Sequence, residues 1–164
     1  MSNKSSYPST RMRRNRMKSF SRKLISENYL NIDDLIWPLF VTEGSGIKEE
    51  ISSMPGIYRN SIDELVKEAE EAVKLGIPAI AIFPQIDKSL KNSSGSEAIN
   101  ENNLVCRSIR SIKKEFPELG VITDVALDPF TDHGHDGLLI NNEINNDETL
   151  KILAKQSIVQ ANAG

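Results

Sequence analysis

Two stretches of the chain carry apolar residues at intervals of three to four positions, with polar residues between them, and a third stretch is also predicted to be helical. They lie at residues 61–76, 103–116 and 147–163. Apolar residues at this spacing line up on one face of a helix, which can then pack against a core. We therefore predict two amphipathic helices and a third helix that is capped by Asn146 or Asp147.

Local signals add detail to the first two helices. Ser61 and Glu64 have the S-x-x-E spacing of a capping box, in which each residue's side chain satisfies a backbone amide of the other. Gly76 follows the last apolar position and suits a left-handed helix end. Cys106 lies near the apolar stripe of the second helix, so we expect its thiol to pack in the core rather than to react.

Three apolar runs alternate with these helices, at residues 33–44, 77–84 and 120–127. The run 77–84 is continuous enough to be buried on both faces, as strands of a parallel sheet are. Pro38 lacks a backbone donor, so the first strand has either an irregular entry or a start near Pro38. The polar stretches between the elements are predicted to be loops, at residues 44–60, 85–101 and 128–146.

A strand followed by a helix, three times over, predicts parallel strands joined by crossover helices. This order fits either a doubly wound sheet or a β/α barrel. No Gly-x-Gly-x-x-Gly follows a strand, which disfavours a dinucleotide-binding sheet. Three units cannot close an eight-unit barrel of ~250 residues, so we expect the chain to be a portion of a longer protein.

The composition is typical of a globular protein, because 38% of the 164 residues are hydrophobic and 26% are charged. No run approaches the ~18 apolar residues of a membrane span, and the first residues lack the apolar segment of a secretory signal. The single cysteine cannot form an internal disulfide. We therefore expect a cytoplasmic protein with no membrane partner.

Charge is distributed unevenly along the chain. The net charge is −3, yet residues 1–23 contain eight Lys and Arg and no Asp or Glu. We predict a basic arm over residues 1–30, loosely helical at 11–29, and a βα domain over residues 31–164. The apolar side of the arm would consist of Met12, Met17, Phe20, Leu24 and Ile25.

A basic arm on an acidic body can bind nucleic acid, hold the acidic surface of another subunit, or remain a solvated tail. Binding to nucleic acid is the least favoured of these three interpretations. The arm lacks interleaved aromatic residues, and the rest of the chain shows no second basic patch.

Ionisable residues gather where the third apolar run ends, in the stretch ITDVALDPFTDHGHDG at residues 122–137. In parallel β/α folds, ligands bind at the carboxyl ends of the strands. We expect Asp124 within the strand and Asp128 on the same face, with the small Ala126 between them leaving room for a ligand. The loop that follows contains Asp132, His133, His135 and Asp136.

The residue types at this position allow two interpretations. Carboxylates with at most one or two imidazoles suit Mg²⁺ or Mn²⁺ better than Zn²⁺. The alternative is an ordinary loop, because Asp and Gly are common turn residues.

Six blocks of the sequence closely resemble the 5-aminolevulinate dehydratase family, whose members are also called porphobilinogen synthases. The blocks are RMRRNR (11–16), DDLIWPLFVTEG (33–44), SMPGIYRNS (53–61), IFPQID (82–87), GSEA (95–98) and ITDVALDPFTDHGHDG (122–137). They occur in the family's order and spacing. The resemblance implies an α/β fold, a (β/α)₈ TIM barrel to which this chain contributes an amino-terminal arm and about the first three βα units.

The resemblance also implies an activity and an assembly. Family members are lyases that condense two molecules of 5-aminolevulinate, with loss of two waters, to porphobilinogen for tetrapyrrole and heme biosynthesis. They form homo-oligomers, commonly octamers, in which an arm wraps a neighbouring subunit. This favours subunit contact over nucleic acid for the basic residues Arg11, Arg13, Arg14 and Arg16.

Zinc-dependent family members carry three cysteines in the strand-end segment, where this chain has Ala126, Asp128 and Asp136. The chain therefore resembles the cysteine-free class, which is often stimulated by magnesium, and we expect no zinc here because tight zinc sites use thiolates. The resemblance implies active-site positions for Asp124, Asp128 and Asp136. Asp128 and Asp136 are candidates for binding Mg²⁺ or the ammonium group of the substrate.

His133 and His135 match family histidines, and they could support the loop or transfer protons. The family's two Schiff-base lysines lie on later strands, beyond the end of this chain, as do its substrate-clamping basic residues and its allosteric magnesium site. We expect the lysines of this chain in helices or polar loops, with none at the carboxyl end of a strand. We therefore predict that these 164 residues alone have no dehydratase activity.

The sequence allows two alternative interpretations of the function. One is a different Schiff-base or metal-assisted barrel aldolase. The other is an inactive half-barrel that acts only through subunit contacts.

Overall fold

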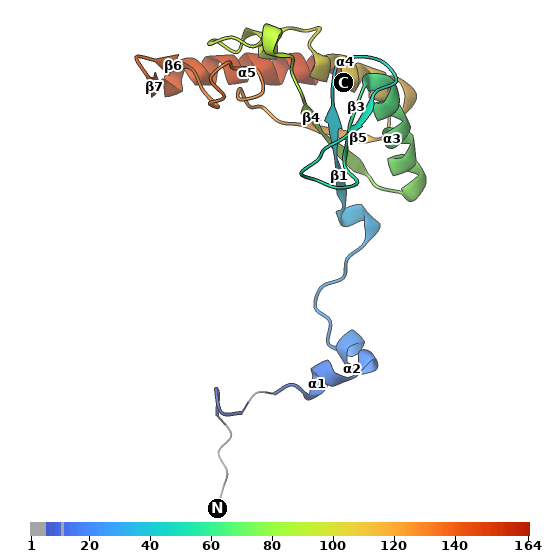
Figure 1. Cartoon of the computed structure of the whole chain (residues 1–164). Coiled ribbons are helices and arrows are strands. Elements are labelled where there is room, and N and C mark those ends of the chain that lie inside the picture. Colours follow the sequence, from blue (N-terminus) through green and yellow to red (C-terminus); the bar gives the residue numbers. More distant parts are fainter. Residues whose placement is uncertain (1–5, 11) are drawn as a thin grey trace, which may run out of the picture. The chain divides into compact units, whose positions relative to one another are not determined.

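The computed structural model describes residues 6–10 and 12–164, and the chain divides into two compact units between Asn31 and Ile32 (Figure 1). The first unit contains two short helices, α1 (Arg14–Met17) and α2 (Ser19–Leu24). Lys18 between them is extended, so the single loose helix expected at 11–29 is instead two separate turns. Hydrogen bonds from Ser21 and Arg22 to backbone carbonyls of the α1 region join the two helices.

The apolar side chains expected on one side of the arm are exposed, and neither helix has a buried residue. Arg13, Arg14 and Arg16 are exposed as well. Arg11, the fourth arginine of the predicted arm, lies outside the described residues.

The second unit is an α/β domain built on one five-stranded sheet with the order β2-β3-β1-β4-β5. Its strands are β1 (Ile36–Val41), β2 (Lys48–Glu50), β3 (Tyr58–Asn60), β4 (Ala79–Pro84) and β5 (Gly120–Thr123). Its main helices are α3 (Ile62–Leu75), α4 (Leu104–Glu115) and α5 (Asn146–Ala163). Three short 3-10 turns complete it: η1 (Ile32–Asp34), η2 (Lys88–Leu90) and η3 (Ser96–Ile99).

The predicted parallel strands are present and adjacent, with β1 paired to β4 along its whole length and β4 paired to β5. Pro38 lies inside β1 rather than at its start. It is tolerated because β1 pairs with β3 only at Phe40 and Val41, so β1 has one partner strand at Pro38 and a missing donor there disturbs little.

The stretch 44–60 was expected to be a loop, and this prediction is wrong. It contains the antiparallel pair β2 and β3, and β3 joins the sheet parallel to β1. These strands are three residues long and mostly polar, so no alternation of apolar residues marks them in the sequence.

Helix α3 begins and ends where the sequence predicts, but its capping differs. The Ser61 hydroxyl accepts a hydrogen bond from the Ile47 amide (2.9 Å) and donates to Asp63 (2.5 Å), so it forms no capping box with Glu64. Glu64 is paired with Lys67 instead. Gly76 ends the helix with φ 77°, in the left-handed conformation that was predicted.

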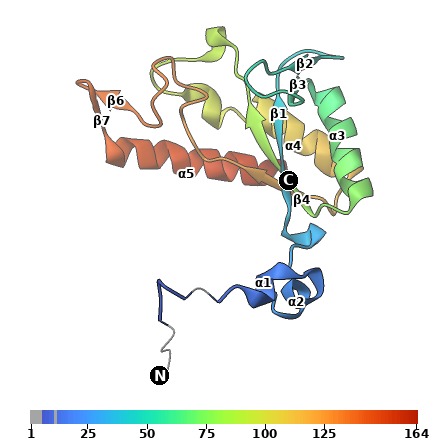
Figure 2. The same ribbon diagram turned by 60° about the horizontal axis from the view of Figure 1, so that its bottom comes forward.

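The core lies between one face of the sheet and the helices α3 and α4, which Figure 2 shows on the same side of β1 and β4. Ile80 and Ile82 of β4 are buried in it, whereas Phe83 on the alternate face is 38% exposed. The expectation that the run 77–84 is buried on both faces is therefore wrong for this chain. Cys106 of α4 is fully buried in the core, as predicted, and burial raises the pKa of its thiol.

The last part of the chain differs from the prediction in two details. Asn145 caps α5 by accepting from the Glu148 amide (3.0 Å), one residue before the predicted cap. The predicted loop before it contains a hairpin of β6 (Leu139–Ile140) and β7 (Glu143–Ile144), which Figures 1 and 2 show at the start of α5. Asn141 and Asn142 form its turn at positive φ, which asparagine tolerates. Among the described residues, no helix is long and apolar enough to cross a membrane.

Candidate active site

The carboxylates predicted at the end of the third strand lie just beyond it rather than within it. Strand β5 ends at Thr123, and the backbone from Asp124 to Ala126 is irregular. The alternation of a strand therefore does not determine which way these side chains point. Ala126 is buried and does not line the cavity of Asp124 and Asp128. Its carbonyl accepts a hydrogen bond from Gln156 of α5 (3.1 Å).

Asp124 and Asp128 nevertheless line one cavity, of about 200 Å³, at the carboxyl ends of β1, β4 and β5. Its walls are largely apolar: Phe40, Ile82, Phe83, Pro84, Val105, Pro129 and Phe130. The rings of Phe40 and Phe83 pack at 5.8 Å between centroids. Two carboxylates in an apolar pocket favour a ligand that presents a positive group to them.

The carboxylates of the site affect one another. The pKa of Asp128 is raised, first because the side chain is partly removed from water and then because of the negative charges of Asp136 and Asp124. The positive charge of Lys91 opposes this shift. An added cation in the cavity would relieve the repulsion between these carboxylates.

Asp136 has a defined structural contact. Its Oδ1 accepts a hydrogen bond from the main-chain amide of Leu127 at 2.6 Å. This bond closes the loop that begins at Asp128, so Asp136 holds the loop's two ends together. Asp132, in the middle of the loop, is exposed.

The two histidines lie next to each other in the same loop, with ring centroids 5.5 Å apart. Nδ1 of His133 accepts from the His135 amide (3.1 Å), and Nε2 of His133 lies 3.4 Å from the Ser93 carbonyl. The main-chain carbonyl of His135 accepts from Thr131 (3.0 Å). His133 thus joins its own loop to the loop after β4, and neither histidine lines the cavity of Asp124 and Asp128.

The loop after β4 is attached to the carboxylate loop by backbone hydrogen bonds. Asn92 donates to the Phe130 carbonyl and accepts from the Asp132 amide, both at 3.3 Å. This connection brings Lys91 close enough to act on the charge of Asp128.

The two lysines expected in a polar loop do lie there, because β4 ends at Pro84 and the 3-10 turn η2 begins only at Lys88. Lys88 and Lys91, in the loop that follows β4, line a second cavity of about 580 Å³ together with Thr42 and Glu43, which follow β1. Glu43 is also paired with Arg107 of α4.

The sequence did not predict two residues of α5 that bond to the main chain of the Asp124–Ala126 segment. Gln156 donates to the Ala126 carbonyl and Gln160 donates to the Asp124 carbonyl, both at 3.1 Å. Both glutamines lie on the buried side of α5. The sequence carries little signal for them, because α5 does not separate apolar from polar residues onto opposite faces.

The same residues do not form a metal centre by themselves. No group of three or more His, Cys, Asp or Glu side chains is arranged to hold an ion anywhere in residues 6–10 and 12–164. Asp128 and Asp136, the predicted ligands, are close enough to repel each other, but Asp136 is engaged with Leu127.

Fold and site together define a class of protein: an α/β chain with parallel β/α units of the TIM-barrel type and a carboxylate-lined cavity where ligands bind such barrels. The family description "Delta-aminolevulinic acid dehydratase" matches residues 9–164. The chain therefore belongs to the delta-aminolevulinic acid dehydratase family, and the fold class predicted from the sequence is confirmed.

Named relatives agree with this assignment. The chain is 58% identical over 154 residues to the delta-aminolevulinic acid dehydratase of Bradyrhizobium diazoefficiens, covering 94% of this chain and 44% of the relative. It is 49% identical over 155 residues to that of Helicobacter pylori, covering 94% and 47%. The chain thus spans less than half the length of these curated relatives.

A solved structure matches as well. It is the delta-aminolevulinic acid dehydratase (porphobilinogen synthase) of Toxoplasma gondii ME49 in complex with the reaction product porphobilinogen. The TM-score is 0.89 at 41% identity, covering 94% of this chain and 44% of that one.

Proposed function

We propose that this chain supplies the carboxylate-bearing part of the active site of a porphobilinogen synthase, which condenses two molecules of 5-aminolevulinate with loss of two waters. The observation that carries the proposal is the likeness to the Toxoplasma dehydratase with its product bound, at 41% identity and a TM-score of 0.89. The cavity of Asp124 and Asp128 lies where barrel enzymes bind their substrates.

The charges of the cavity suit the proposed substrate. 5-Aminolevulinate carries an ammonium group at one end, and Asp124 and Asp128 would attract it. The apolar wall of Phe40 and Phe83 would exclude water and strengthen this attraction. Binding the ammonium would hold the adjacent ketone carbon in a fixed position for condensation.

The covalent step needs a lysine that attacks the ketone to form a Schiff base. No lysine among the described residues lines the cavity of Asp124 and Asp128. We propose that the Schiff-base lysines, and any magnesium requirement, depend on residues outside positions 1–164. The proposed active enzyme is therefore a longer protein than these residues.

A chimera tests the proposal. Residues 1–164 would replace the matching segment of the Bradyrhizobium relative, and porphobilinogen formation from 5-aminolevulinate would be measured with that relative as the positive control. We expect activity within about tenfold of the control, and loss of activity in D124A and D128A variants of the chimera. A folded chimera without activity, beside an active control, would contradict the proposal.

The same chimera tests the metal and the assembly. Because the strand-end segment carries no thiolate, we expect no tightly held zinc after dialysis, measured by elemental analysis. We also propose that the basic arm holds a second copy of the protein in a cytoplasmic homo-oligomer. Replacing Arg13, Arg14 and Arg16 by glutamate should then lower the mass measured by light scattering, and an unchanged mass would contradict the role of the arm.

A further inference from the structure

Helix α5 turns polar side chains toward the protein interior. Its buried residues are Thr149, Gln156, Gln160 and Ala163, which share one face of the helix. The exposed residues of the same helix include Leu150 and Ile158, at 54% and 61%. We call Thr149, Gln156 and Gln160 the polar stripe of α5.

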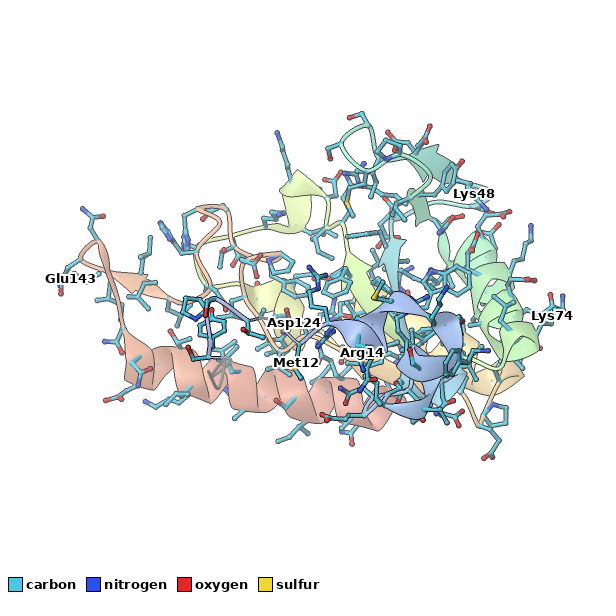
Figure 3. All side chains as sticks on the ribbon, turned by 90° about the horizontal axis from the view of Figure 1, so that it is seen from below. Met12, Arg14, Lys48, Lys74, Asp124 and Glu143 are labelled. Carbon is cyan, nitrogen blue, oxygen red and sulfur yellow. The ribbon has the colours of Figure 1, made fainter. Side chains whose placement is uncertain are left out.

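Every member of the polar stripe binds the main chain of the segment that carries the carboxylates. Gln160 donates to the carbonyl of Asp124, and Gln156 donates to the carbonyl of Ala126. Thr149 accepts from the amide of Leu138 at 2.9 Å. Figure 3 shows Asp124 beside α5, at a distance from Glu143 on the β6–β7 hairpin.

The polar stripe forms its bonds with the backbone just beyond the end of strand β5. Strand β5 ends at Thr123, so the backbone of Asp124 and Ala126 has no strand pairing to fix it. The glutamines replace that pairing with bonds from the next helix. Gln160 also accepts from the Thr123 hydroxyl (3.1 Å), so it spans the point where the strand ends.

Stability alone does not explain glutamines at these positions. Gln156 is fully buried, and its Oε1 has no hydrogen-bond partner among the described residues. A buried polar atom without a partner destabilises a fold. Leucine or methionine would avoid this cost at Oε1 but would leave the Ala126 carbonyl without its donor, so the bond to that backbone is what glutamine supplies here. Gln156 keeps an unpaired buried oxygen while it fixes the main chain of the candidate site, and local departures from good packing of this kind are typical of functional sites.

We propose that Gln156 and Gln160 are positioning residues of the proposed condensation reaction. They hold the carbonyls of Ala126 and Asp124, and through this backbone they aim the side chains of Asp124 and Asp128 into their shared cavity. The inference rests on the proposed function, because it assigns these glutamines to that same site.

The test uses the chimera with Q156M and Q160M, separately and together. Methionine keeps the length and volume of glutamine but cannot form the two bonds to the main chain. The control is S157A, because Ser157 lies on the same helix and its exposed hydroxyl donates to the carbonyl of Leu153, also in α5. Misplacement of catalytic groups by about 1 Å can lower rates ~100-fold.

We expect kcat/KM to fall about tenfold to 100-fold in Q160M and further in the double variant, with KM for 5-aminolevulinate raised. A loss of folded molecules would lower the apparent kcat but would leave KM unchanged. S157A should match the parent within about twofold. Variants with parental kcat and KM, in a parent that is active, would overturn the inference and leave the proposed function intact.

A second measurement does not depend on activity. Hydrogen exchange of the peptide segment 124–138 should become at least about tenfold faster in Q156M/Q160M, while exchange of β4 stays unchanged. Unchanged exchange in segment 124–138 would overturn the inference even if the parent chimera proved inactive. Equal acceleration in both segments would show that the glutamines serve general stability only, which also contradicts positioning.

Discussion

The carboxylate of Asp136 accepts a hydrogen bond from the main-chain amide of Leu127 at 2.6 Å. The sequence suggests Asp136 as a metal ligand, but in the structure its carboxylate also holds the two ends of its own loop together. D136A should lower the free energy of unfolding by about 1 kcal/mol, because the amide of buried Leu127 loses its acceptor. D136N keeps an oxygen that can accept and should lose less than half as much in denaturant unfolding. Equal losses in both variants would show that charge, and not this bond, matters.

Asp128 makes the stability of the domain depend on pH. Its folded-state pKa is raised by burial and by the charges of Asp136 and Asp124, so the folded state binds the proton more tightly than the unfolded state. Stability should therefore fall as pH rises from about 3.8, the ordinary pKa, through the raised folded-state pKa.

The variant D128N should remove this dependence. We expect it to stabilise the domain at pH 7 by less than about 1 kcal/mol, because solvent screens the partly exposed carboxylates. The difference from the parent should vanish below the ordinary pKa. Thermal unfolding at pH 3 and pH 7 measures this, and a D128N protein less stable than the parent at pH 7 would refute the assignment.

Ser61 joins the β2–β3 region to the start of α3. It is fully buried, and its hydroxyl accepts from the Ile47 amide and donates to Asp63. S61A should destabilise the domain by about 1–3 kcal/mol in urea unfolding, because the Ile47 amide loses its acceptor. S157A, which removes an exposed hydroxyl within α5, should change stability by less than about 0.5 kcal/mol. Similar values for the two variants would speak against a structural role for Ser61.

Gly76 ends α3 in the left-handed conformation, with φ 77°. G76A should lower stability by about 1–2 kcal/mol, because a Cβ is strained at this φ. G76N should lose less, because asparagine visits this conformation more readily. The order of unfolding midpoints, parent above G76N above G76A, checks the explanation, and G76A at least as stable as G76N would contradict it.

Residues 1–164 by themselves should form no porphobilinogen from 5-aminolevulinate. The cavity of Asp124 and Asp128 is lined by no lysine among the described residues, and the reaction needs a free amine to activate the ketone. The chimera with the Bradyrhizobium relative, assayed beside the chain, is the control. Turnover by the isolated chain above the level of a D124A/D128A variant would overturn the prediction.

The sequence predicts the helices and strands whose apolar residues form a long, regular pattern. The helices α3 and α4 and the strands β1 and β4 lie close to the predicted ranges, because their apolar residues follow one pattern over several positions. Helix α5 also lies close to its predicted range, although its buried face is mostly polar. Strands β2 and β3 are short and polar, so their place in the sheet depends on pairing with β1, which no local pattern encodes.

The sequence predicts the position of the candidate site correctly, but the structural reason for that position is different. Asp124 and Asp128 do share a cavity, but β5 ends before Asp124, so strand alternation is not the reason. Their placement follows from contacts with distant residues, above all Gln156 and Gln160, and with the loop at Asn92. Such contacts between remote parts of the chain leave no periodic trace in a single sequence.

The only cysteine of the chain, Cys106, is fully buried in α4, and burial raises the pKa of its thiol. Reactive thiolate is therefore scarce at neutral pH, and oxidants or mercurial reagents cannot reach the sulfur without local opening of the helix layer. The strand-end segment itself presents the carboxylate oxygens of Asp124 and Asp128 to its cavity, and no sulfur. Slow reaction with thiol reagents is thus the expected consequence of where the chain keeps its one sulfhydryl.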